Sequence, residues 1–101
     1  MTPGSVAEFI AQRGETITIT RPSDVSVNLT AKAYCRLYRP NEIAGNVLQG
    51  DREVRIAATA LSQAPLKGDR VLIGGKTTTV QFVWPAKIGE ETAVHILQVR
   101  G

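Results

Sequence analysis

Apolar side chains recur at every second position along most of the chain after residue 15, which is the period of a β-strand. The longest alternation spans residues 25–38, and one buried face beside one polar face is typical of an antiparallel sheet. Because this run is longer than an average strand, we expect an irregular lead-in and then a strand near 29–39. The residues expected to face the core are Val25, Val27, Leu29, Ala31, Ala33, Cys35 and Leu37.

Further alternating segments are separated by residues that favour turns. Pro22, Ser23 and Asp24 mark one turn, and the Gly74-Gly75 pair is typical of a type I′ β-hairpin. In the segment 76–84 the alternation places Thr78, Val80, Phe82 and Trp84 on one face. Besides 29–39, the pattern predicts strands at 52–61, 70–73, 76–84 and 92–100, with two-residue alternation at 15–21 and a turn at 85–90.

The spacing of these segments leaves no room for crossover helices, so the sequence predicts a mostly β fold, a small antiparallel β-barrel or sandwich. One short helix is expected over 5–13, because Ser5 and Glu8 have capping-box spacing and Gly14 can end the helix. Segments 71–73 and 93–97 are apolar on both faces. We expect them to lie between the barrel interior and the docked helix, or between subunits.

A long central loop is expected over 40–51, where Pro40, Gly45 and Gly50 interrupt the alternation. Loops of this length in compact domains are usually functional or disordered. Its apolar residues Ile43, Val47 and Leu48 have two interpretations: they fold back under the barrel, or they contact a partner.

The composition is that of one ordinary globular domain, 1–101, with 43% hydrophobic and 21% charged residues. The net charge of +3 is small, its basic residues are dispersed, and the chain shows no internal repeat. Cys35 is the single cysteine, which fits a reducing compartment and a small buried side chain. No apolar run is long enough to span a bilayer, so we expect a soluble protein made in the cytoplasm.

Candidate chemistry is sparse. Cys35 and His95 are the single residues of their types, which is too few for a zinc site, and each lies in an apolar alternation. The Gly74-Gly75 pair precedes a strand rather than a helix, unlike a phosphate-binding loop. No pair of acidic residues suggests an acid–base dyad. We therefore expect a protein that is not an enzyme and that uses no cofactor, metal or catalytic residue.

The C-terminal part has a recognisable order of features: a Gly68-Asp69 turn, an apolar strand with Val71 and Ile73, the Gly75 hairpin, a strand through Val80 to Trp84-Pro85, and a final Leu97–Arg100 segment. With the strands and loop before it, this order resembles the small head–tail joining proteins of long-tailed bacteriophages, also called head-closure, stopper or tail-attachment proteins. The resemblance covers roughly residues 25–101.

The resemblance implies a virion structural protein, a small β-barrel that forms a ring of about six or twelve copies in the phage neck, with its portal or adaptor and tail proteins as partners. Such rings join the filled head to the tail and help to retain DNA, which the ring could contact non-specifically, and no membrane is involved. By position, 40–51 corresponds to the loop that orders on assembly. The implied interface residues are Asn41, Glu42, Ile43, Asn46, Val47, Leu48 and Gln49, and those implied for channel or subunit contact are Arg36, Arg39, Arg52 and Arg55.

Two alternatives stay open at this point. A tail-terminator or tail-completion protein would use a similar small β-rich subunit. A small nucleic-acid-binding β-barrel would fit the pI of 9.4 and the arginines, but aromatic residues make up 5% of the chain, which is few for stacking on bases. The arginines themselves could also be ordinary solvated strand residues.

Overall fold

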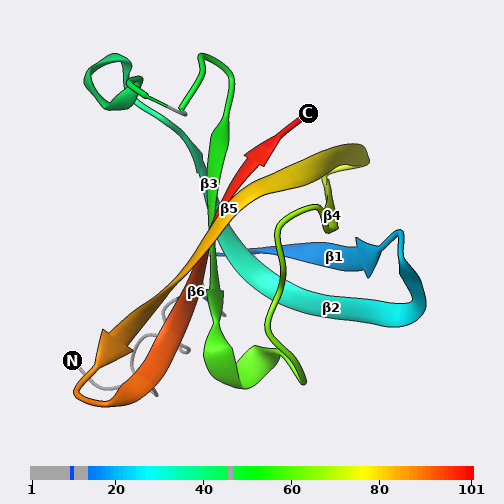
Figure 1. The fold of residues 1–101 in the computed structure, drawn as a ribbon. Coiled ribbons are helices and arrows are strands. Elements are labelled where there is room, and N and C mark those ends of the chain that lie inside the picture. The colour runs from blue at the N-terminus through cyan, green and yellow to red at the C-terminus, as the bar shows by residue number, and fades with distance from the viewer. Residues whose placement is uncertain (1–9, 11–13, 46) are drawn as a thin grey trace.

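A closed barrel of antiparallel strands forms the body of the protein in the computed structural model (Figure 1), which describes Ile10 and residues 14–45 and 47–101. The barrel order is β1-β2-β3-β6-β5-β4, and β4 pairs with β1 to close it. This confirms the mostly β prediction and decides for the barrel over the sandwich. The strands are β1 (Glu15–Arg21), β2 (Asp24–Leu37), β3 (Arg52–Ala57), β4 (Arg70–Ile73), β5 (Lys76–Ile88) and β6 (Glu91–Arg100).

Local turn chemistry sets two of the hairpins. Between β1 and β2, the Asp24 carboxylate accepts hydrogen bonds from the backbone N–H of Ser26 at 3.0 Å and from its hydroxyl at 2.6 Å. Between β4 and β5, Gly74 and Gly75 have φ of 56° and 84°, the two positive angles that a type I′ turn requires. The predicted strand 70–73 and its glycine hairpin are therefore confirmed residue for residue.

Three predicted boundaries are wrong. β2 is one continuous strand of 14 residues, with no irregular lead-in. β3 ends at Ala57 and passes into the 3-10 turn η2 (Ala58–Ala60). β5 continues through Pro85 to Ile88 instead of turning at 85. Beyond Val80, β5 pairs with β6 alone among the described residues. This stretch is therefore an edge, where Pro85 is tolerated although it has no N–H.

The barrel interior is filled by aliphatic side chains from all six strands. In β2, Val27, Ala31 and Ala33 are buried as the alternation predicts. Val25 and Leu37, near the two ends of the same strand, are 95% and 60% exposed, contrary to what the alternation predicts. The interior cluster comprises Ile17, Ile19, Ala31, Ala33, Val54, Ile56, Val71, Ile73, Val80, Leu97 and Val99.

A second, smaller cluster covers part of the outer surface of β3 and β6. Ile10 is buried there against Ala57, Val94 and Ile96. The apolar outer face of 93–97 is therefore covered, as expected for a strand that is apolar on both sides. In the other segment that is apolar on both faces, 71–73, Leu72 is 43% exposed. The helix predicted over 5–13 lies outside the described residues except for Ile10 and is not confirmed.

The loop between β2 and β3 extends beyond the barrel at the end where the C-terminus also lies (Figure 1). The β5–β6 hairpin lies at the opposite end (Figure 1). Within the described residues, no helix has the length and apolar character needed to cross a bilayer.

Candidate functional site

Two turns with nearly the same sequence lead into β3 and β4: LQGDR at 48–52 and LKGDR at 66–70. In each turn the leucine N–H donates to Oδ2 of the aspartate, at 3.0 and 2.9 Å, and the aspartate N–H donates to the leucine carbonyl, at 3.0 and 3.1 Å. The glycines have φ of 95° and 92°. The two turns share four of their five residues, a short repeat that the sequence analysis did not identify. So short a match becomes evident only with the matching geometry.

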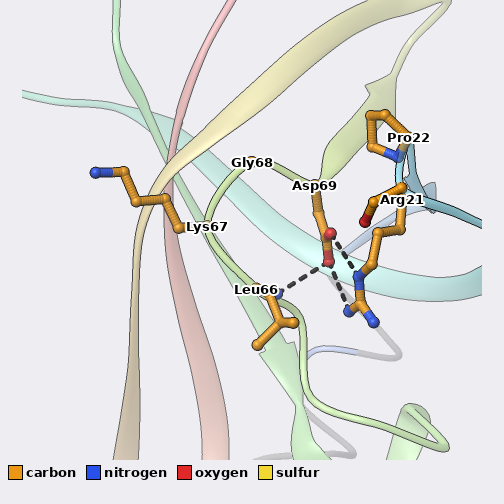
Figure 2. Close-up of a pocket in the computed structure, with 7 residues that line it drawn as sticks. Arg21, Pro22, Leu66, Lys67, Gly68 and Asp69 are labelled. Carbon is orange, nitrogen blue, oxygen red and sulfur yellow. Dashed lines mark hydrogen bonds and ion pairs between the residues drawn. The ribbon is translucent and has the colours of Figure 1, made fainter.

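Each aspartate is bound by an arginine at the end of a neighbouring strand. Arg100, at the end of β6, donates to Asp51 at 2.9 and 3.0 Å. Arg21, at the end of β1, donates to Asp69 at 2.8 and 3.0 Å (Figure 2). Exchanging β1 with β6, β2 with β5 and β3 with β4 leaves the barrel order unchanged. The two turns therefore occupy equivalent positions in the strand order of the barrel.

Both carboxylates are 1% exposed, and internal donors occupy both of their oxygens. The hydrogen bonds from Arg100 hold the pKa of Asp51 at about 2, well below its usual range. A surface hollow of about 230 Å³ adjoins Asp69, but Lys67 on its rim points away from the Asp69–Arg21 pair (Figure 2). We conclude that these aspartates fix the starts of β3 and β4 and have no free oxygen for proton transfer.

The loop 38–51 is tied to the barrel near its start by one charged cluster. Within the 3-10 turn η1 (Pro40–Glu42), both Glu42 oxygens accept from the Arg36 guanidinium, at 2.8 and 2.9 Å. Glu42 also accepts from the Arg39 N–H at 2.8 Å. The bonds from Arg36 lower the pKa of Glu42 to about 2. Arg36 in turn contacts Glu53 of β3 at 3.0 Å and lies 5.6 Å from the Tyr38 ring centre.

The loop residues that the resemblance implies for an interface differ in exposure. Ile43 and Val47 are half-buried, whereas Leu48 is 51% exposed. Glu42 is half-buried in its ion pair, and Asn41 and Gln49 are exposed. Asn46 lies outside the described residues. Their role in an interface stays a prediction.

The four arginines implied for channel or subunit contact do not share one surface. Arg36 and Arg55 lie on adjacent strands, and both bind the buried carboxylate of Glu53. Arg39 is exposed at the start of the loop. Arg52 is half-buried and close enough to Cys35 to influence the pKa of its thiol. The placement of these arginines therefore does not favour one subunit or channel contact that includes all four.

An exposed aromatic surface on the outside of the barrel was missed by the sequence analysis. Phe82 and Trp84 are exposed although Thr78 and Val80 of the same strand are buried, so the prediction that all four share a face is wrong. A β-bulge between Val80 and Phe82 is the cause, because one extra residue moves the following side chains to the other face.

Cross-strand pairing does not make this surface continuous across the sheet. Tyr34 of β2 pairs with Arg55 of β3, but Arg55 and Trp84 are separated by Ile96 of β6, which is buried in the cluster with Ile10. The Lys67 ammonium lies 5.6 Å from the centre of the Phe82 ring. The outer face therefore carries an aromatic ring next to a cation in two separate places, Tyr34 with Arg55 and Phe82 with Lys67.

Cys35 and His95, the single cysteine and the single histidine, are not brought together as a nucleophile and its base would have to be. Cys35 pairs with Val54, whereas His95 pairs with Ile56 two residues further along β3. Burial raises the pKa of the Cys35 thiol to about 12 and lowers the pKa of His95. The thiolate of Cys35 is therefore scarce at neutral pH. In the described part of the chain, no three His, Cys, Asp or Glu side chains are grouped to hold a metal ion.

Comparison with known proteins found no matching family model, no matching curated protein and no matching solved structure.

Proposed function

We propose that this protein is a structural subunit of the phage neck, a head-closure or head–tail connector protein that forms a ring between the portal or adaptor and the tail. The resemblance of residues 25–101 is its starting point. The observation that carries it is the loop 38–51, which extends from the end of a closed barrel and presents Leu48 to solvent.

Closure of the barrel restricts how copies could assemble. Each strand is paired on both sides along part of its length through the β1–β4 closure. Among the described residues, two open edges remain, the part of β5 after Val80 and the part of β2 before Ala33. Subunit contacts can then come from these edges as well as from loops and side-chain faces. A head-to-tail contact of this kind closes into a ring when its rotation permits.

A loop replacement tests this function in particles of a phage that encodes the protein. Replacing residues 43–47 by two glycines leaves Glu42 and the turn 48–52 in place, so we expect a folded barrel. We expect filled heads that fail to attach tails, counted by electron microscopy of lysates. The matched control replaces exposed Ser62 and Gln63 by glycine and should give tailed particles. Normal tailed particles from the loop replacement would refute the proposed function of the loop.

The aromatic and cationic outer face favours a second candidate, a nucleic-acid-binding barrel. Aromatic rings stack on bases in a sequence-tolerant way, and cations neutralise phosphates. If this candidate is right, the isolated protein binds single-stranded oligonucleotides with a steep dependence on salt, and Trp84→Ala weakens binding by about tenfold or more. Absence of binding at low salt would eliminate it, without affecting the neck proposal.

A further inference from the structure

Arg36 is the centre of the contacts that hold the first part of the loop. Its guanidinium binds Glu42 through two nitrogens, binds Glu53 at 3.0 Å, and lies over the ring of Tyr38. One side chain thus connects the loop, the base of the loop and strand β3. Arg36 and Glu42 are both about 30% exposed, so water and ions can reach the pair.

Other contacts of this part of the loop are local. The N–H groups of Glu42, Ile43 and Val47 bond to carbonyls within the loop, at 2.8, 3.3 and 3.1 Å. None of these bonds joins a strand of the barrel. At its far end the loop is secured separately, where the Asp51 carboxylate binds Arg100 and Gln98. Between these two ends, and among the described residues, the Glu42 carboxylate is the group that ties the loop to a strand by hydrogen bonds.

The present position of the loop is unfavourable for one group, the hydroxyl of Tyr38. Its hydroxyl is buried and has no hydrogen-bond partner among the described residues. A buried polar group without a partner raises the free energy of the state that contains it. Release of the Arg36 guanidinium, which lies over the Tyr38 ring and is held there by Glu42, would admit water to this hydroxyl and remove that cost.

We propose that Arg36 and Glu42 form a latch that holds the start of the loop against β2 and β3, and that the loop can leave this closed position while the barrel stays folded. The latch comprises the two side chains and their paired bonds. Opening breaks these bonds, leaves the Asp51 anchor intact and gives the Tyr38 hydroxyl a water partner. In the proposed neck ring, the opened loop is the form that reaches an adjoining subunit, and in this respect the inference rests on the proposed function.

Hydrogen exchange of the isolated full-length protein, followed residue by residue by NMR, tests the latch. In Glu42→Gln, which keeps the shape of the side chain and removes its charge, we expect the amides of residues 42, 43 and 47 to exchange about three to ten times faster. Amides of Ile56 and Leu97 in the barrel should be unchanged. The matched control is Glu91→Gln, the same change at an exposed position at the opposite end, which should alter no loop amide.

Salt gives a second, independent readout. At 1 M NaCl the latch is screened, so loop exchange in the unmodified protein should rise toward that of Glu42→Gln, and salt should change the variant little. Unchanged loop exchange in the variant would overturn the latch, and so would equal acceleration of barrel amides. Because these measurements use the isolated chain, their failure would leave the neck assignment standing, and the loop replacement in particles tests that assignment separately.

A tyrosine titration follows Tyr38 itself. The Tyr34→Phe background leaves Tyr38 as the single tyrosine. Burial raises the pKa of the Tyr38 phenol in the closed state. Adding Glu42→Gln should lower this pKa toward its ordinary value, measured by ultraviolet difference absorbance. A pKa that stays equally raised would show that the hydroxyl remains buried, which contradicts opening.

Discussion

Replacement of Asp69 by alanine should lower the free energy of unfolding by about 3–5 kcal/mol, a large part of the 5–15 kcal/mol typical of a domain. The carboxylate is 1% exposed, so its removal leaves the Arg21 guanidinium partly buried without its counter-charge. It also removes the acceptor of the Leu66 N–H at the start of the turn. Urea denaturation followed by Trp84 fluorescence measures the loss.

The equivalent turn supplies an internal check of this expectation. Asp51→Ala also removes a buried acceptor, that of Arg100 and the Gln98 amide, but the Arg100 side chain is 37% exposed and water screens its charge, so the loss should be smaller than at Asp69. The double variant Arg21→Met/Asp69→Ala also removes the guanidinium charge that Asp69→Ala leaves without its partner. It should therefore recover part of the lost free energy of unfolding. Asp24→Ala, at an exposed turn, should lower the free energy of unfolding far less than Asp69→Ala. A loss below about 1 kcal/mol at Asp69 or Asp51 would contradict the buried-pair account of the two turns.

Leu97→Ala should lower the free energy of unfolding by about 2–5 kcal/mol, because it creates a cavity in the centre of the barrel. Leu97 is 0% exposed and lies on β6 between Val54 of β3 and Val83 of β5. Neighbouring strands hold the site open, so the interior cannot collapse freely around the missing atoms. Thermal and urea unfolding both report the change.

Leu72→Ala is the matched control for this core substitution. It removes the same atoms from an outward-facing side chain that is 43% exposed, so it should cost less than about 1 kcal/mol. If the two variants lose the same stability, the division of the leucines into inner and outer faces of the barrel is wrong.

Alternation and turn chemistry were enough to predict most of the strands. The pattern is local, because side chains two apart share a face wherever the backbone is extended. Gly74-Gly75 and strand 70–73 agree residue for residue, since the positive φ of both glycines is a property of that turn alone. The loop position followed from its proline and glycines.

The functional surfaces were predictable to a smaller extent. The loop 40–51 was found by its break in pattern, but its latch was not, because Arg36, Glu42 and Glu53 meet through the pairing of β2 with β3. Phe82 and Trp84 were assigned to the wrong face, because a bulge depends on the partner strand and leaves no mark in a two-residue period. The paired turns went unnoticed, because their arginines lie 48 and 49 residues from the aspartates.

The amino-acid sequence by itself determined that this chain forms short antiparallel strands with an interrupting loop, because strand period and turn preference are properties of neighbouring residues. Closure of β4 onto β1, the burial of Asp51 and Asp69 beside distant arginines, and the outward aromatic face were decided only in the tertiary structure. These features depend on which strands meet and in which register, and no single strand contains that information.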